Sequence, residues 1–189
     1  MPHRLKFQNT CSPSINLILA TLLSLLGSPA TGKETQLKVE QFMMDLTKTT
    51  PRSSGEMMLG IVQLARATDK AKASAHDTLG EYKYDCPMDQ GLFEYLDMDP
   101  MAFLNVVKDA KNDSEIEAYA RTFVTRKDPR NIEAFNKKFL SAVPTGESLK
   151  HFEELRSKIA PSRTDVVSWS DLLDLEEGRT VPHRGMVHA

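Results

Sequence analysis

Apolar side chains recur at helical spacing along most of residues 56–176, and no alternating pattern of paired strands interrupts them. The periodicity predicts seven segments of helix, at residues 56–75, 88–96, 100–110, 113–125, 129–142, 147–160 and 169–175. No internal repeat divides this series. We therefore expect a mainly α fold, a compact bundle of about six or seven short helices.

Polar residues and prolines mark where these helices start and stop. Asp99-Pro100 and Asp128-Pro129 each place a capping acid before a proline in the first helical turn. Asp113 or Ser114 is expected to cap the helix that follows residue 112, and Ser53 or Ser54 the helix that begins at residue 56. Residues 79–87 contain a glycine, two tyrosines and a proline, and predict an extended connector that could include one short strand.

Residues 1–42 differ in composition from the rest and are excluded from the predicted fold. A basic start, an apolar run at 15–26 and small residues at 28–30 have the layout of a secretory signal, which is too short to span a membrane. Two alternatives stand beside this one: a misplaced start site, since Met43-Met44 directly precedes the organised sequence, or an amphipathic or disordered extension. We expect one helical domain at 43–179 and a disordered tail at 180–189. The expected location is the cytoplasm, or export if the signal-like segment at 1–30 is genuine.

Composition narrows the classes of function. The net charge is −2 with acids and bases interspersed, which argues against a nucleic-acid binder with its basic face. The two cysteines do not form a disulfide framework, and the five histidines lack the spacing of a zinc site. We expect no metal, no cofactor and no stable membrane span.

The helix expected at 56–75 carries ionisable side chains next to its apolar stripe. These side chains, which border or interrupt the apolar arc, are Arg66, Asp69, Lys72 and His76. Charges within such an arc are costly unless they are paired. One interpretation is a set of ion pairs within the helix, with aliphatic stems covering the core edge. The other is a pocket whose floor is the apolar stripe.

The stretch GEYKYDCPMD at 80–89 raises the same choice between a packed corner and a site. Tyr82 and Tyr84 would lie on one side of an extended connector. Cys86 precedes Pro87 at a helix start, where a cysteine is either a reactive thiolate or a small apolar filler. Glu81 could pair with a cation of the first helix and fold the connector back over it. That arrangement would gather seven side chains: Arg66, Asp69, Lys72, Glu81, Tyr82, Tyr84 and Cys86.

Two other places in the sequence allow a similar choice. The segment Pro51-Arg52-Ser53-Ser54, at a helix start, could hold an anion, or it could be an ordinary capped start. Trp169 is expected to anchor the core rather than to stack on a ligand.

Four motifs occur in an order that resembles the bacterial DUF5069 family of uncharacterised proteins. They are PRSS at 51–54, LARATDKAKA at 64–73, GEYKYDCPMD at 80–89 and RTDVVSWSDLLDLEEGR at 163–179. The resemblance covers about residues 44–179. The chain departs from the family pattern at four positions: Ser54, Ile61, Lys72 and Met88. The family has no established activity, so the resemblance implies a fold and the place of a site but no reaction.

Three functions compete on these grounds. The first is a binding or regulatory module that holds a small anionic ligand or a protein partner through Arg66, Asp69, Lys72, Glu81, Tyr82 and Tyr84; the lack of a catalytic signature favours it. The second is an enzyme or thiol-redox protein with Cys86 as nucleophile and His76 or Lys72 as base. The third is a purely structural protein. The simplest observation that separates these three functions is whether Cys86 opens into a cavity shared with the charges of the first helix.

Overall fold

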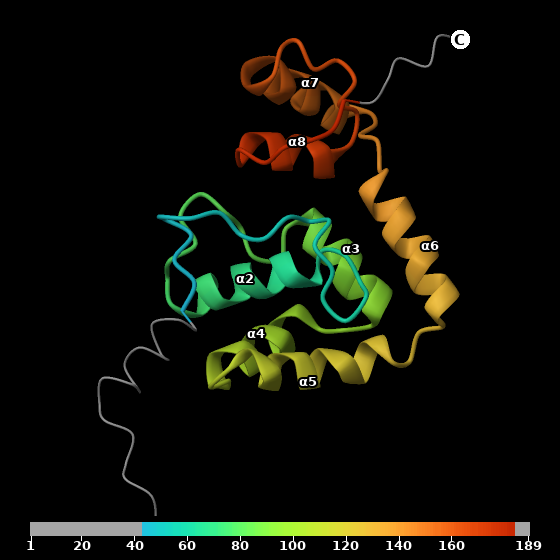
Figure 1. The fold of residues 1–189 in the computed structure, drawn as a ribbon. Coiled ribbons are helices and arrows are strands. Elements are labelled where there is room, and N and C mark those ends of the chain that lie inside the picture. The colour runs from blue at the N-terminus through green and yellow to red at the C-terminus, as the bar shows by residue number, and fades with distance from the viewer. Residues whose placement is uncertain (1–42, 184–189) are drawn as a thin grey trace, which may run out of the picture. The chain divides into compact units, whose positions relative to one another are not determined.

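The computed structural model describes residues 43–183, so the predictions for residues 1–42 and for 184–189 lie outside the described residues. Within this part the chain forms seven helices, and the mainly α fold class is confirmed. The helices are α2 (Leu64–Ala75), α3 (Pro87–Leu96), α4 (Pro100–Asp109), α5 (Asp113–Val124), α6 (Pro129–Leu140), α7 (Glu147–Ile159) and α8 (Trp169–Glu176) (Figure 1).

The helix starts follow local sequence signals closely. The Asp99 carboxylate accepts a hydrogen bond from the amide of Ala102, and the Asp128 carboxylate accepts one from the amide of Arg130. Both acids cap a helix that begins with proline, as the sequence predicts. The cap of α5 is Asn112, one residue before the expected position. These side chains satisfy amides that have no partner inside their helices.

The first predicted helix is shorter than expected, because it begins at Leu64 and not at residue 56. Leu59, Gly60 and Gln63 have positive φ angles of 57°, 80° and 66°, which no right-handed helix contains. The chain turns back on itself here, and Met58 and Ile61 exchange both backbone hydrogen bonds. Glycine at position 60 adopts its left-handed conformation without strain. The expected capping by Ser53 or Ser54 is therefore wrong, since the helix starts elsewhere.

A distant side chain stabilises this turn. Asn136 of α6 is buried, and its amide group donates a hydrogen bond to the carbonyl of Gly60 while its Oδ1 accepts one from the amide of Val62. The two bonds are 2.9 Å and 3.1 Å long. Methionine and leucine in this segment favour helix, but the bonds to Asn136 are available only when the segment is a turn.

We expect the Asn136→Ala variant to lose about 2 kcal/mol of unfolding free energy, because it leaves two backbone groups of the turn without partners. Urea denaturation measures this loss. Asn131→Ala on the same helix is the matched control, since residue 131 is exposed. Equal losses in the two variants would contradict the role given to Asn136.

Helix α2 lies at the centre of the described residues (Figure 1). Every residue from Leu64 to Ala73 is buried, so the predicted one-sided stripe is wrong. Met57, which lies within the predicted helix at 56–75, is 58% exposed because it precedes the observed helix. The main apolar cluster surrounds α2 with side chains of α3, α4 and α5, and the largest of these are Phe93, Phe103 and Ile116.

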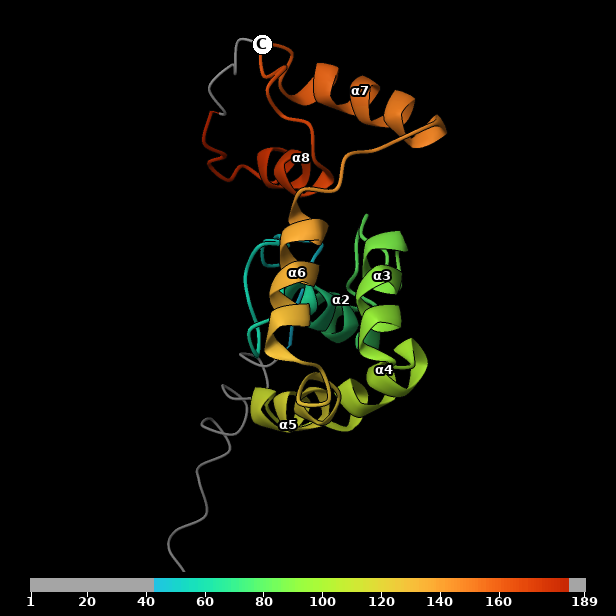
Figure 2. The ribbon, with the colours of Figure 1, turned by 90° about the vertical axis from the view of Figure 1, so that its right-hand side faces the viewer.

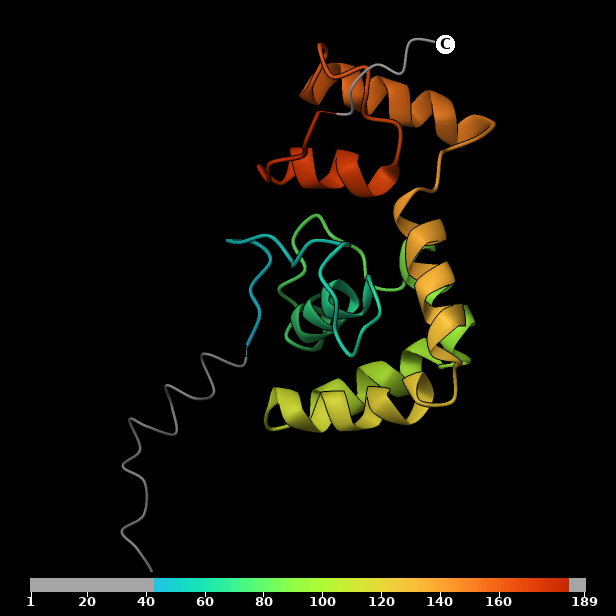
Figure 3. The same ribbon diagram turned by 45° about the vertical axis from the view of Figure 1, so that its right-hand side comes forward.

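A second, smaller apolar cluster belongs to α7, α8 and the segments after them. It contains Phe152, Val166, Leu172 and Val181, with Trp169 packed at its edge. The Trp169 ring meets the Phe152 ring edge to face at 5.1 Å between centroids. Helix α6 leads from α5 toward this second cluster (Figures 2 and 3). The described residues therefore hold two apolar clusters.

The connector between α2 and α3 is not extended throughout. Gly80 and Asp85 have positive φ angles of 60° and 57°, and each lies in a turn. A side chain at position 80 would also collide with the carbonyl of Leu46, because an added Cβ would lie 3.0 Å from that oxygen. These turns fold the connector back along α2, which is the expected course. The expected cause is not observed, because Arg66, Lys70 and Lys72 pair with Glu177, Asp89 and Asp113 and not with Glu81.

None of the described helices is both long and apolar enough to cross a membrane.

Candidate functional site

The charged side chains of α2 bind partners outside the helix. Asp69, which is 1% exposed, accepts hydrogen bonds from the backbone amide and the guanidinium of Arg52 at 2.8–3.2 Å. Lys72 forms an ion pair with Asp113 at the start of α5. Asp69 and Lys72 thus pair with residues outside the helix, contrary to the interpretation as ion pairs within it. The anion hypothesised for Arg52 is supplied by the protein itself, as the Asp69 carboxylate.

Arg66 connects α2 to the end of α8. Its guanidinium forms a two-pronged ion pair with Glu177, and the two side chains are 4% and 3% exposed. Arg179 binds the same carboxylate. Burial disfavours the ionised form of Glu177, but the hydrogen bonds and charges of Arg66 and Arg179 outweigh it and hold the pKa of Glu177 below its ordinary value of 4.5. The Arg66 guanidinium also lies over the Tyr82 ring, 5.6 Å from its centroid.

Burial and the nearby Glu177 carboxylate raise the pKa of Tyr82 to about 12. The phenol therefore remains protonated at neutral pH. It can donate a hydrogen bond but cannot act as an anionic base there.

The Asp89 carboxylate is the meeting point of a second polar group. It is fully buried and receives hydrogen bonds from the Lys70 ammonium at 2.5 Å, from the Gln63 side-chain amide at 2.9 Å and from the Cys86 backbone amide at 3.2 Å. Lys70 also donates to the Lys83 carbonyl at 3.2 Å and to the Cys86 sulfur at 3.3 Å. Its three donor directions are thus all used.

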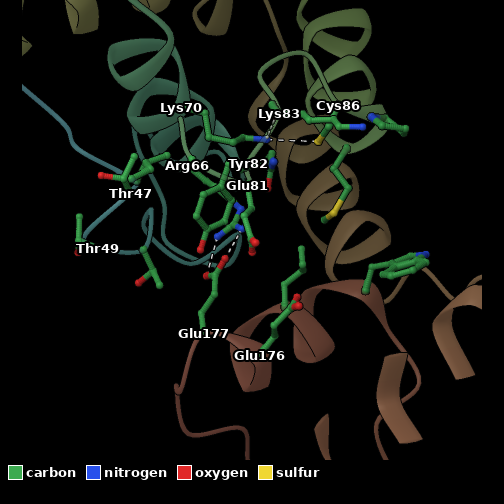
Figure 4. A pocket seen from close by; sticks show the side chains of 18 of the residues that line it. Thr47, Thr49, Arg66, Lys70, Glu81, Tyr82, Lys83, Cys86, Glu176 and Glu177 are labelled. Carbon is green, nitrogen blue, oxygen red and sulfur yellow. Dashed lines mark hydrogen bonds and ion pairs between the residues drawn. The ribbon is translucent and has the colours of Figure 1, made fainter. Parts of the chain in front are cut away.

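These two groups lie at the wall of a cavity of about 1320 Å³ (Figure 4). One part of the wall consists of Gln63 at the N-cap of α2 and of Arg66 and Lys70 on that helix. The connector and the start of α3 contribute residues 80–83 and 86–88. The remaining wall comes from residues 46–50 and from α7 and α8, including His151, Trp169, Leu173, Glu176 and Glu177. Figure 4 shows Lys70 reaching the sulfur of Cys86 and Arg66 reaching Glu177.

One polar atom at this wall has no partner. The Gln63 side chain is 0% exposed, and its amide nitrogen binds Asp89, but its Oε1 accepts no hydrogen bond. A buried carbonyl oxygen without a donor is costly, so a native structure that contains one requires an explanation.

Six of the seven predicted site residues divide into two sets. Arg66, Glu81, Tyr82 and Cys86 line the cavity. Asp69 and Lys72 are held in their ion pairs with Arg52 and Asp113.

Tyr84 packs instead in the core. Its ring meets that of Phe93, and its hydroxyl donates to the Pro100 carbonyl at 2.7 Å. Burial and neighbouring carboxylates, Asp89 first, raise the pKa of Tyr84 above its ordinary value. Tyr82 and Tyr84, expected on one side of an extended connector, lie in different surroundings, because Tyr82 lines the cavity and Tyr84 packs against Phe93.

Sequence reasoning missed several residues of this region: Gln63, Lys70, Asp89 as an ion-pair partner, Trp169 as a wall residue, and Glu177. The partner of Lys70 is Asp89. A signal for this pair is present in the sequence, because Asp89 follows Cys86 by three residues at the start of a predicted helix. The capping box that these two residues form is observed.

A family model described as Domain of unknown function (DUF5069) matches residues 48–179. The chain belongs to this family. No curated protein matches it. The match includes α2, the connector, α3 and α8, so the DUF5069 domain contains the cavity wall from Lys48 onward. Among the described residues of this DUF5069 protein, no group of three histidine, cysteine, aspartate or glutamate side chains is arranged to hold a metal ion.

Proposed function

We propose that this DUF5069 protein is a binding module that holds a small anionic ligand in the cavity between α2, the connector and α8. The observation that carries the proposal is the unpaired Oε1 of Gln63 at the cavity wall. A ligand N–H or O–H group is the simplest partner for this oxygen. Pockets for small molecules combine apolar and aromatic walls with a few fixed polar groups, and this cavity has both.

The charges favour an anion at the α3 end of the cavity. Lys70 and Lys83 border this end, and the start of α3 contributes the positive end of the helix dipole. The Lys70 charge is balanced by Asp89, whereas Lys83 is exposed and lines the cavity. The α8 end of the cavity carries the carboxyl groups of Glu176 and Glu177. Burial and the neighbouring Glu177 raise the pKa of Glu176 above its ordinary value, because a further negative charge is unfavourable there. An anion is therefore expected near Lys83 and away from Glu176.

The aromatic side chains at the wall suit a ligand with a flat apolar part. Tyr82 and the half-buried Trp169 both line the cavity. Trp169 is the only tryptophan of the chain. Its fluorescence therefore reports on this wall alone.

A test uses anilinonaphthalene sulfonate, an aromatic anion, as the probe and energy transfer from Trp169 as the readout. We expect saturable binding to the full chain. Lys83→Glu should weaken this binding about tenfold, which corresponds to ~1.4 kcal/mol, because a negative charge replaces a positive one at the opening. Lys108→Glu makes the same charge change at an exposed position of α4 away from the cavity wall.

Two results would contradict the proposal. The first is dye binding without energy transfer from Trp169, which would place the dye elsewhere on the protein. The second is equal weakening of dye binding by Lys83→Glu and Lys108→Glu, which would mean that the net charge of the protein causes the effect and not a charge at the cavity.

A further inference from the structure

The Cys86 side chain occupies a place that packing alone does not require. It is half-buried and lines the cavity. Its sulfur accepts a hydrogen bond from the Lys70 ammonium at 3.3 Å, and Cys86 is the N-cap of α3, where it forms a capping box with Asp89. A cation and a helix N-terminus beside a sulfur that solvent can reach are the surroundings in which nucleophilic cysteines occur.

The position of Lys70 is held by other contacts. The Asp89 carboxylate and the Lys83 carbonyl bind two of its three N–H groups, and the third is directed at the sulfur. The enzyme or thiol-redox alternative needs a nitrogen within hydrogen-bond reach of Cys86, and that nitrogen belongs to Lys70. Neither of the bases expected from the sequence, His76 and Lys72, lines the cavity.

Gln63 gives an independent indication of the kind of ligand that binds near the Cys86 sulfur. Its side-chain amide binds the same Asp89 carboxylate that binds Lys70 and the amide of Cys86, so the three residues share one carboxylate. Its unpaired, fully buried Oε1 requires a donor. The backbone N–H of a peptide is such a donor, and a peptide with free carboxylates also suits the cationic α3 end of the cavity.

We propose that Cys86 is a site of reversible thiol–disulfide exchange with small anionic peptide disulfides. The Cys86 thiolate attacks one sulfur of the disulfide, a new sulfur–sulfur bond forms, and the second half leaves as a thiolate. Two electrons move from Cys86 to the leaving thiol, and the reaction needs no further oxidant. The Lys70 ammonium orients the attacking sulfur. This inference rests on the proposed ligand cavity and adds a covalent step to it.

The test uses the full chain with Cys11→Ser, which leaves Cys86 as the only thiol, and oxidised glutathione as the probe. Intact mass follows the gain of one glutathionyl group at pH 7, for the native protein and for the protein unfolded in urea. Each rate of glutathionylation is divided by the rate of a free small-molecule thiol in the same solution, so that the two solutions can be compared. We expect the native rate to exceed the unfolded rate by about tenfold. A native rate equal to or below the unfolded rate overturns the proposal.

A second disulfide tests the role of the peptide. Hydroxyethyl disulfide has no amide and no carboxylate, so the native protein should prefer oxidised glutathione by more than the unfolded chain does. The same preference in both states would overturn peptide recognition. Cys86→Ser should show no exchange. Binding of anilinonaphthalene sulfonate is measured separately on the Cys11→Ser protein, in which Cys86 is intact. If that dye binds normally but native Cys86 fails to exchange, only this inference fails and the proposed binding function stands.

Discussion

Replacing Lys70 by methionine should destabilise the protein by about 3–5 kcal/mol, because the fully buried Asp89 carboxylate then loses its balancing charge. The side chains of this pair are only 3% and 0% exposed, so water cannot take the place of the ammonium. Urea unfolding followed by circular dichroism measures the loss. Lys108→Met, at an exposed position of α4, is the matched control and should change stability by less than about 1 kcal/mol.

A double-mutant cycle separates the ion pair from other effects of the substitution. Asp89→Leu removes the second charge, so the double variant should lose less than the sum of the two single losses. If the two losses add, the pair contributes no interaction energy and the explanation is wrong.

Two adjacent glutamates at the end of α8 should respond in opposite directions to the same substitution. Glu177→Gln should lose about 3 kcal/mol at pH 7, because it removes the charge that balances Arg66, whose side chain is 4% exposed. Glu176→Gln should be neutral or slightly stabilising, because burial and the neighbouring Glu177 already disfavour its ionised form and raise its pKa. Thermal unfolding of both variants at pH 7 gives the comparison, and losses of the same size would contradict it.

The pH dependence follows from the lowered pKa of Glu177. A carboxylate whose folded pKa lies below its unfolded value adds stability above the unfolded value, here 4.5, and loses that contribution as pH falls through the folded value. The wild-type protein should therefore lose part of its stability as the pH falls below about 5. Glu177→Gln should lose less over this range, since it has no proton to gain. Hydrogen exchange in α8 should also rise in this variant at pH 7.

The helices that the sequence predicts well are those whose boundaries depend on neighbouring residues. Asp99-Pro100 and Asp128-Pro129 set the starts of α4 and α6, because the cap and the capped amide lie within three residues of each other. The segment before α2 shows the opposite case. Its turn is stabilised by Asn136, whose Oδ1 binds an amide 74 residues away in the sequence. Helix propensity gives no indication of such a bond.

The candidate site was predicted in part for the same reason. The connector motif led correctly to Arg66, Tyr82 and Cys86 as neighbours, because a short link after α2 must return along that helix. The partner of Arg66 is Glu177, 111 residues away, and no local pattern identifies it. A helix buried on all sides also has no polar face, so angular position could not show which charges of α2 reach the cavity.

The contacts between α2 and α8 have a consequence for the uniqueness of the fold. Two apolar surfaces can shift past each other by a helical turn with little change in free energy, since the hydrophobic effect does not depend on the orientation of the contacting groups. The two-pronged ion pair of Arg66 with Glu177 forms in a single alignment of the two side chains. A shift that separates them would leave both charges buried without a partner. The two apolar clusters are thus linked by bonds that reject a shifted alignment, and α8 can close one side of the cavity in a single register.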